Sequence, residues 1–525
     1  MRMTLLLIAA QMVIAGIADA QIREAQVTGG RVSGVVTNSI AAFKGIPFAA
    51  PPVGDLRWKA PQPVKTWSGV KAASSFAPGC IQDTGLAKLF GAPDVISEDC
   101  LYLNVWTPAA TATERLPVMV WIYGGAFTSG MTSIPAYDGA LLAERGVVLV
   151  SVSYRVGAFG FLAHPELSKE SGKGSGNFGL QDQIAGLRWV KENVAKFGGD
   201  PNQVTIFGES AGGISVSMLA TSPAAKGLFH RAISESGGSF GPARITNEGG
   251  ATVPSLRVAE TTGQALLKRL GVADIAAARQ LPSVTIQGAL GGGLASGFWP
   301  VFDGDVLPGD QYELYQARRF NDTPILIGTN SDEGITFVPG TAQPDAFEKA
   351  IRGAYGAQAD TVLAAYPHAT VPESTQSARN IFRDATFAWH TWAWALLQSK
   401  HGQGKAYVYY FDHRTPLSPN GAGHAAEIPY VFRTLGTFKG PAAFVGATRP
   451  EDRAMSDLMS SYWVNFAKTG DPNGPGLPQW PAFTESAQTT MYFDAKSSAR
   501  PAPNMTQIKA LDEYFAWRRD EAKKK

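Results

Sequence analysis

The chain has 525 residues, of which 45% are hydrophobic, and a formal net charge of +2 at pH 7. This length and composition allow a large buried core. Lysine and arginine are scattered along the chain rather than gathered into a stripe, which argues against a nucleic-acid partner.

The first 20 residues have the pattern of a secretory signal peptide. Arg2 precedes an apolar run that ends at Ile17 and is short for a bilayer span, and an A-x-A site ends at Ala20, just before Gln21. We therefore predict cleavage after Ala20 and a secreted or periplasmic protein, with an uncleaved anchor as the alternative. Because no later segment is a long apolar run, no stable membrane insertion of the mature chain is expected.

Cys80 and Cys100 are the two cysteines of the chain. An even pair in an exported protein favours a disulfide, and the spacing fits no zinc site. Closing a loop of about 20 residues would stabilise the fold by roughly 3 kcal/mol on the chain-entropy model. We expect this loop to lie near the rim of a site.

Apolar runs rich in Val, Ile and Tyr alternate with helical patterns along the chain. One helical pattern covers residues 180–197, and residues 26–36 alternate as a small antiparallel edge would. Predicted buried strands cover residues 118–123, 147–153, 204–207, 232–236, 324–328 and 406–411. The rhythm predicts an α/β fold with a central, mainly parallel sheet flanked by helices.

Two helix-rich segments, about 239–320 and 335–405, interrupt this rhythm. No linker-like or low-complexity segment separates them from the rest, so we interpret them as insertions that cap the sheet. We therefore predict a single catalytic domain over residues 21–525.

A glycine turn follows the strand predicted over residues 118–123. Gly124, Gly125 and Ala126 stand after Tyr123, in a pattern like the H-G-G-G turn of oxyanion holes with Tyr in place of His. Small residues let backbone N–H groups approach a developing oxyanion. A glycine pair after a strand is otherwise a common turn, so this interpretation depends on a nucleophile elsewhere.

That nucleophile is predicted at Ser210. The strand over residues 204–207 breaks into G-x-S-x-G, with Gly208 and Gly212 on either side of the serine, before a helix-compatible segment. This is the context of a nucleophile elbow, a strained strand-to-helix turn that exposes the serine hydroxyl. The N–H of the next residue, Ala211, would then contribute to an oxyanion hole.

A serine hydroxyl needs a base, and histidine is the usual one near neutral pH. In hydrolases with a nucleophile elbow, the catalytic residues follow one another along the chain in the order Ser, acid, His. This order excludes the first two of the seven histidines, His164 and His230, as the base. His390 lies in a tryptophan-rich helix and is expected to be packed there. His413 ends a predicted strand and could serve. His424, in a glycine-rich loop, is favoured because a loop of small residues lets the ring reach the elbow.

The acid that orients the histidine is expected after the strand at residues 324–328. Asp332 and Glu333 stand there together, followed by Gly334. Both carboxylates belong to a carboxyl end of the sheet, and the residue pattern alone does not choose between them.

Together these segments resemble the type-B carboxylesterase and cholinesterase family of α/β-hydrolases. The resemblance covers about residues 25–520. The family's signature segments match residues 207–213 and 98–105, and further matches fall at residues 43–52, 197–201 and 300–304. The resemblance implies an α/β-hydrolase fold and a serine esterase that uses no cofactor or metal.

The family's catalytic residues fall on particular positions of this chain. Its acid is the glutamate of D-E-G, which matches Glu333 rather than Asp332. Its histidine matches His424. The resemblance therefore implies the triad Ser210, His424 and Glu333.

The resemblance also implies the oxyanion donors and the disulfide. The donors match the backbone N–H groups of Gly125, Ala126 and Ala211, and the family's cysteine pair is similar to Cys80 with Cys100. One departure concerns substrate. Cholinesterases carry a tryptophan in the disulfide loop that stacks on choline, and residues 81–99 contain none, so choline esters are not expected.

The function expected from the sequence is hydrolysis of a small carboxylic ester through an acyl-enzyme. A lipase or an amide hydrolase with the same triad is the first alternative. A non-catalytic, cholinesterase-like binding module is an alternative of another class, which the presence of all three triad residues disfavours. The natural ester and the oligomeric state do not follow from the sequence.

Overall fold

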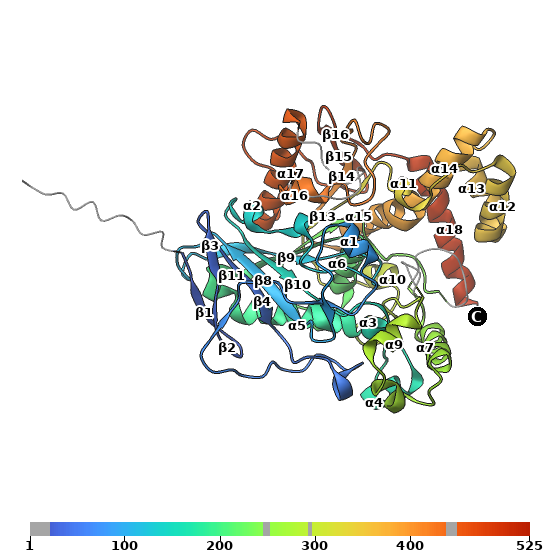
Figure 1. Cartoon of the computed structure of the whole chain (residues 1–525). Helices are drawn as coiled ribbons and strands as arrows, with labels where there is room; N and C mark the ends of the chain where they lie inside the picture. The colour runs from blue at the N-terminus through green and yellow to red at the C-terminus, as the bar shows by residue number, and fades with distance from the viewer. Residues whose placement is uncertain (1–20, 245–252, 292–296, 437–448, 525) are drawn as a thin grey trace, which may run out of the picture.

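The structure of the chain is a computed structural model, and it describes residues 21–244, 253–291, 297–436 and 449–524 (Figure 1). The predicted signal peptide, residues 1–20, lies outside the described residues. Within the described residues, no helix combines the length and the apolar character needed to cross a bilayer.

The core of the fold is an 11-stranded sheet with the strand order β16-β15-β14-β13-β12-β11-β9-β10-β8-β4-β3. Its strands are β3 (Val35–Thr37), β4 (Ile40–Pro47), β8 (Tyr102–Thr107), β9 (Leu116–Ile122), β10 (Val148–Val152), β11 (Gly199–Glu209), β12 (Arg231–Glu235), β13 (Ile325–Asn330), β14 (Ala406–Phe411), β15 (Thr489–Phe493) and β16 (Ser498–Pro501).

The centre of this sheet is parallel, as predicted. Strand β9 pairs in parallel with both β10 and β11, and parallel pairing continues from β11 through β12, β13 and β14 to β15. The edges are antiparallel, at β16 and from β8 to β3. All six residues of β13, which is parallel to both of its neighbours, are buried, because a parallel strand covered on both faces has no polar side.

Smaller sheets lie beside the large one. Strands β1 (Glu24–Val27) and β2 (Gly30–Ser33) form the antiparallel edge predicted near the start of the mature chain, and β5 (Val70–Ala72) joins β2. Strands β6 (Gly79–Cys80) and β7 (Ile96–Ser97) pair near the ends of the loop that the disulfide closes.

Helices cover both faces of the sheet and form two groups at one side of it. The helix predicted over residues 180–197 is α5 (Phe178–Asn193) and a following 3₁₀ turn, η3 (Val194–Phe197). The other helices and turns outside the two helix-rich segments are η1 (Gly54–Leu56), α1 (Gly85–Leu89), η2 (Pro135–Tyr137), α2 (Ala140–Ala143), α3 (Gly157–Phe161), α4 (Pro165–Ser171), α6 (Ala211–Thr221), η4 (Pro223–Ala225), α16 (Ile428–Val431), α17 (Pro450–Thr469) and α18 (Met505–Lys523).

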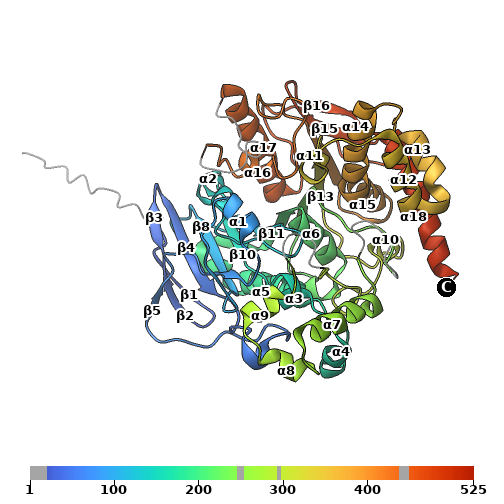
Figure 2. The ribbon, with the colours of Figure 1, turned by 45° about the vertical axis from the view of Figure 1, so that its right-hand side comes forward.

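The described parts of the two predicted helix-rich segments contain helices. The first contains α7 (Leu256–Leu270), α8 (Ile275–Arg279), α9 (Ser283–Gly288) and α10 (Gln311–Gln316). The second contains α11 (Gly334–Phe337), α12 (Pro344–Tyr355), η5 (Gly356–Gln358), α13 (Ala359–Ala365), α14 (Val371–Arg383), a π-helical turn η6 (Asp384–Ala388) and α15 (Trp389–His401). In Figure 1, α7 and α9 lie at the lower right of the molecule and α12–α14 at the upper right, and Figure 2 again shows α7–α9 below α12–α14.

The predicted disulfide is confirmed. Cys80 and Cys100 are bonded at an S–S distance of 2.06 Å, and both are buried. The bridge closes a loop that carries the short helix α1, which lies in front of the sheet in Figure 1.

Candidate active site

Ser210 stands in a strained turn between β11 and α6. Its backbone angles are φ 57° and ψ −124°, a conformation that costs energy in any residue with a Cβ. Its N–H donates to the carbonyl of Glu235 at 2.8 Å. A Cβ at Gly208 would lie 2.5 Å, and one at Gly212 2.0 Å, from the carbonyl oxygen of Ile122. The two glycines of G-x-S-x-G are therefore required by the close approach of β9.

Glu333 is fully buried just after β13 and contacts the ring of His424. Its Oε2 lies 2.6 Å from His424 Nδ1. Its Oε1 accepts hydrogen bonds from Ser236 Oγ at 2.5 Å and from the N–H of Asn330 at 2.7 Å. Three donors therefore fix the orientation of this carboxylate. The structure places Glu333 against the histidine and leaves Asp332 away from the ring, its Oδ1 buried without a hydrogen-bond partner.

The loop before His424 is tied to the segment that carries Glu333. The N–H of Ala422 donates to Ser331 Oγ and its carbonyl accepts from the N–H of Asp332, both at 2.8 Å. Asn330 Nδ2 donates to the carbonyl of Gly423, also at 2.8 Å. These bonds hold the glycine-rich loop rigidly enough to position an imidazole, although its sequence suggested flexibility.

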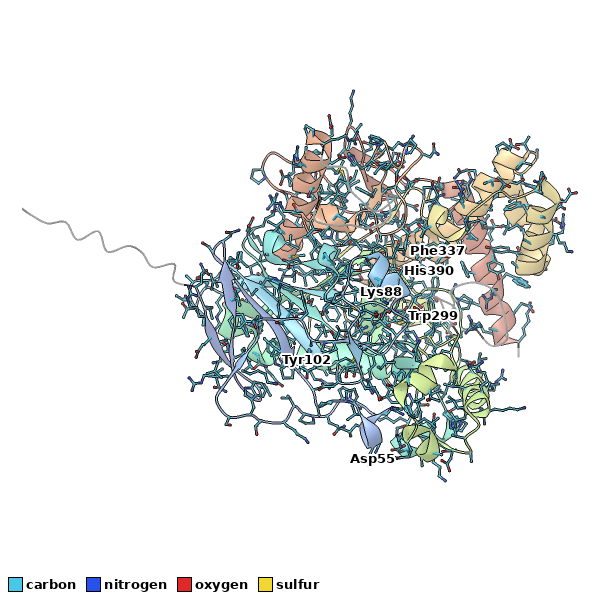
Figure 3. All side chains as sticks on the ribbon, viewed as in Figure 1. Asp55, Lys88, Tyr102, Trp299, Phe337 and His390 are labelled. Carbon is cyan, nitrogen blue, oxygen red and sulfur yellow. A yellow bond between two sulfur atoms is a disulfide. The ribbon has the colours of Figure 1, made fainter. Side chains whose placement is uncertain are left out.

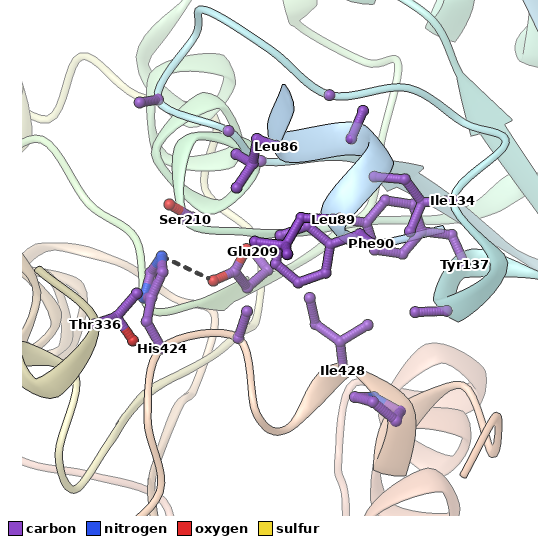
Figure 4. Close-up of a pocket in the computed structure, with 18 of the residues that line it drawn as sticks. Leu86, Leu89, Phe90, Ile134, Tyr137, Glu209, Ser210, Thr336, His424 and Ile428 are labelled. Carbon is purple, nitrogen blue, oxygen red and sulfur yellow. Dashed lines mark ion pairs between the residues drawn. The ribbon is translucent and has the colours of Figure 1, made fainter. Parts of the chain in front are cut away.

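The second ring nitrogen of His424 faces the nucleophile turn. Nε2 lies 3.1 Å from Oε1 of Glu209, and Ser210 lines the same pocket (Figure 4). No hydrogen bond joins Ser210 Oγ to Nε2 in the described part of the chain. Catalytic hydrogen bonds are often long or poorly aligned before substrate binds, so the absence of this bond is compatible with His424 as a base.

The other two candidate histidines lie elsewhere. His413 pairs through Nε2 with Oδ1 of Asp452 at 2.7 Å and lines a separate surface groove with Arg449. His390 is buried in α15, as predicted, and its Nδ1 accepts from the N–H of Phe240 at 2.9 Å. Burial lowers the pKa of His390 to about 3. A ring that stays neutral at this place is a packing element of the core.

The turn after β9 has the backbone shape of an oxyanion hole. Gly125, Ala126 and Phe127 have φ angles of 113°, 54° and 59°, in the left-handed region. Neither Gly125 nor Ala126 donates its N–H to an acceptor among the described residues. Ala211 begins α6, where a helix has no internal acceptor for its N–H groups. All three predicted donors are therefore unused by the described part of the fold.

Three further glutamates are buried beside Glu333, and the sequence pattern did not single them out. Glu209 and Glu235 are register partners on β11 and β12, and Glu427 follows His424. Burial is the main cause that raises the pKa of Glu235 to about 8 and the pKa of Glu209 and Glu427 well above the ordinary value. The available signal was an acidic residue at the carboxyl end of two adjacent apolar strands.

A pocket of about 160 Å³ opens over Ser210. Helix α1 forms one wall, and in Figure 4 Leu86, Leu89 and Phe90 lie opposite the ring of His424. The remaining apolar lining comes from Ile134, Ala136, Tyr137, Phe337, Ala425, Ile428 and Pro429. No lysine or arginine is among the described residues that line it, so the walls favour a neutral, apolar group.

Comparison with known proteins identifies relatives over nearly the whole chain. The family model "Carboxylesterase family" matches residues 19–511. A fumonisin B1 esterase of Sphingopyxis macrogoltabida is 36% identical over 477 residues, which are 88% of this chain and 85% of the relative. A para-nitrobenzyl esterase of Bacillus subtilis is 36% identical over 92% of this chain and 97% of its own length. A mouse cholinesterase is 35% identical over 89% and 83%.

Solved structures confirm the predicted α/β-hydrolase fold. A thermophilic para-nitrobenzyl esterase superposes with a TM-score of 0.81 at 34% identity, covering 94% of this chain and 100% of that one. A carboxylesterase of Geobacillus stearothermophilus gives 0.80 at 34% identity, covering 93% and 99%. The chain therefore belongs to the type-B carboxylesterase and cholinesterase family, and it is a carboxylesterase.

Proposed function

We propose that Ser210, His424 and Glu333 form the catalytic triad of this esterase. The observation that carries the proposal is the 2.6 Å contact between Glu333 and His424 Nδ1, on a ring that faces the same pocket as Ser210. A carboxylate bound at Nδ1 fixes the ring tautomer and stabilises the imidazolium that forms during catalysis.

The reaction proceeds through an acyl-enzyme. Ser210 Oγ attacks the ester carbonyl carbon while His424 Nε2 takes its proton. The N–H groups of Gly125, Ala126 and Ala211 stabilise the oxyanion, a type of contribution worth about 2.7 to 4 kcal/mol for one donor. The imidazolium then protonates the departing alkoxide. Water, deprotonated by the same ring, attacks the acyl carbon and releases the acid and Ser210.

The pocket supports a neutral carboxylic ester with an apolar group as substrate. Its lining is dominated by aliphatic and aromatic side chains, with Glu209 as the acidic residue close to Ser210. The disulfide loop lacks the tryptophan on which cholinesterases stack choline, so a choline ester is a poorer candidate. A lipase or amide hydrolase with the same triad stays the alternative.

Replacement of the nucleophile tests this proposal. Ser210→Ala is expected to reduce hydrolysis of a p-nitrophenyl ester by a factor of about 10³ or more, since only binding and the oxyanion hole would act. A fluorophosphonate probe should label the wild-type chain at Ser210 and leave the variant unlabelled. Ester hydrolysis by Ser210→Ala at the wild-type rate would defeat the assignment, as would a wild-type chain that takes up no label.

We also propose that the chain is exported. The support is the signal-peptide pattern of residues 1–20 together with the buried disulfide, since such bonds persist in oxidising compartments. The protein recovered from the periplasm or medium should begin at Gln21 by N-terminal sequencing. An intact Met1 on that fraction, or its restriction to the cytoplasm, would argue against export.

A further inference from the structure

A π-helical turn joins α14 to α15 and brings one phenylalanine to the site. Such turns insert an extra residue into a helix and are frequent at functional sites. Phe387 lies in this turn, η6, and only 3% of it is exposed. Its ring stacks on the ring of His424, with centroids 4.8 Å apart and planes inclined by 20°.

The turn is fixed to the segment that carries the acid. Arg383 Nε donates to Oδ1 of Asp384 at 2.8 Å, and its Nη1 donates to the carbonyl of Ser331 at 2.9 Å. Tyr366 donates its hydroxyl to Oδ2 of Asp384 at 3.0 Å. Ser331 also holds the loop before His424 through the N–H of Ala422. The π turn, the acid segment and the histidine loop therefore form one hydrogen-bonded unit.

A second aromatic ring meets the histidine from another direction. Phe337, labelled in Figure 3 on the right-hand part of the molecule, contacts the ring of His424 at 5.0 Å and 62°. Phe382 stacks on Phe337 at 4.8 Å, meets Phe387 edge-on with centroids 6.2 Å apart, and has no ring contact with His424 among the described residues. Phe387 is thus the aromatic ring that lies flat against the imidazole, and Phe337 meets it at a steep angle.

We propose that Phe387 is a positioning residue for the catalytic base, held against the imidazole face by the π turn. This inference rests on the proposed triad. During turnover Nε2 must exchange a proton with Ser210 while Nδ1 stays on Glu333, which requires the ring to keep its plane. A face-to-face phenylalanine resists rotation out of that plane. Its π-face also stabilises the imidazolium, because a cation above an aromatic face is attracted by the ring quadrupole.

The ionisable groups at the two ring nitrogens are carboxyls, Glu333 at Nδ1 and Glu209 at Nε2. Glu235 acts electrostatically on Glu209 from β12, and Glu427, in the segment after the histidine loop, interacts with both Glu209 and Glu333. On the π-turn side the charges of Arg383 and Asp384 are paired with each other. Replacing Phe387 by leucine changes none of these groups and keeps an apolar side chain at the same place.

The test compares Phe387→Leu, Phe387→Tyr and Phe382→Leu by full pH profiles of kcat and kcat/KM on a p-nitrophenyl ester. Phe387→Leu should lower kcat by roughly tenfold with little change in KM, because a misplaced catalytic group costs rate. The acid limb of its pH profile, which is the fall of kcat/KM towards low pH, should move to lower pH by about half a pH unit, since the imidazolium loses the aromatic face. Phe387→Tyr should restore both values, and Phe382→Leu should match the wild type.

Two results would overturn the positioning role. One is a Phe387→Leu enzyme with the wild-type kcat and acid limb. The other is a Phe382→Leu enzyme with the same defects as Phe387→Leu, which would indicate general loosening of the aromatic cluster. Failure of the triad itself is a separate result, since it would appear as activity in Ser210→Ala. Labelling of each Phe387 variant by the fluorophosphonate probe reports that the nucleophile is intact.

Discussion

His424 Nε2 lies 3.1 Å from Oε1 of Glu209, the residue directly before Ser210. The ring that we propose as the base is therefore held between two carboxyls, with Glu333 at Nδ1 and Glu209 at Nε2. Burial, then the charges of Glu333 and Glu235, raise the pKa of Glu209 well above its ordinary value. Glu209 thus keeps its proton at pH values where an exposed carboxyl has lost it.

Glu209→Gln reproduces the protonated form of this residue. At slightly acidic pH the variant should keep most of the wild-type kcat/KM, in contrast with the roughly 100-fold or larger loss that follows removal of a general base. At higher pH the two should diverge, because only wild-type Glu209 ionises and then attracts the imidazolium away from Ser210. Parallel pH profiles of kcat/KM check this. A roughly 100-fold loss already at slightly acidic pH would contradict a protonated Glu209.

Comparison of Glu333→Gln with Asp332→Asn tests which of these two adjacent carboxyls is the catalytic acid. The amide cannot stabilise the imidazolium and can hold the wrong ring tautomer, so kcat should fall by about 10³- to 10⁴-fold. Asp332→Asn is the matched control, because its carboxyl lies next in sequence and does not touch the ring. The control should stay within about threefold of the wild type, as for changes outside the catalytic unit. Equal losses in both variants would mean that the segment, and not Glu333 itself, matters.

Glu235 makes stability depend on pH in a direction that can be derived. Burial raises its pKa from 4.5 to about 8, and Trp463 donates to its Oε1 at 2.8 Å. Between these two pH values the folded chain holds a proton that the unfolded chain has lost. The free energy of unfolding therefore declines as pH rises through this window and levels off above it.

Glu235→Gln removes this titration and keeps an oxygen for Trp463. Near pH 4.5 the variant and the wild type should unfold at similar temperatures. Above pH 8 the variant should be more stable by about 1 kcal/mol or more, because a tenfold difference in proton affinity between the folded and unfolded chains is worth about 1.4 kcal/mol. The measurement is the thermal unfolding of the variant and the wild type near pH 4.5 and above pH 8. A variant that is less stable than the wild type on the alkaline side would show that the carboxylate is stabilising there.

The central strands of the large sheet, β9 to β14, followed from local pattern. Residues 406–411 are β14 with the predicted bounds, and the strand predicted over 118–123 is β9, displaced by one or two residues. Continuous runs of β-branched and aromatic residues identify such strands because both faces are buried. The nucleophile turn was equally local, since G-x-S-x-G must relieve the crowding of β9 against β11.

Contacts across the sheet did not follow in the same way. Nothing local indicates that Glu209 on β11 stands beside Glu235 on β12, because strand order and register are properties of the whole fold. The π turn at Phe387 was also missed. Its sequence fits an ordinary helix, and the extra residue becomes evident only when Asp384 is anchored to Arg383 and Tyr366.

Removing the disulfide should lower the free energy of unfolding and have little effect on the rate of the catalysed reaction. Cys80→Ala with Cys100→Ala frees a loop with a sequence separation of 20 residues. The chain-entropy model gives a loss of roughly 3 kcal/mol in the free energy of unfolding. Because α1 lies within this loop and lines the pocket, KM should rise while kcat for a small ester changes little. Chemical denaturation and steady-state kinetics measure both effects. Unchanged stability would indicate that packing of the loop, and not the bridge, holds it.

Helix α1 separates the pocket over Ser210 from a neighbouring cavity. Leu86 and Leu89 line both spaces, and the second is also lined by Thr128, Gln287 and Leu290. Leu86→Ala should therefore join part of the two spaces and admit larger esters. Because one methylene in an apolar pocket is worth roughly 10- to 200-fold in discrimination, kcat/KM for a bulky ester relative to a small one should rise roughly tenfold.

Val95→Ala is the control for this prediction. Val95 belongs to the same disulfide-closed loop, is 55% exposed and lines neither space. It should leave the ratio of bulky to small ester unchanged, whereas general loosening of the loop would alter the ratio in both variants. The measurement is kcat/KM over esters in which the acyl and alcohol groups grow independently. His424, which we propose as the group that protonates the departing alkoxide, lines the pocket opposite Leu86, so the gain should follow the size of the alcohol. A gain that follows the acyl group instead would place the alcohol on the other side of Ser210.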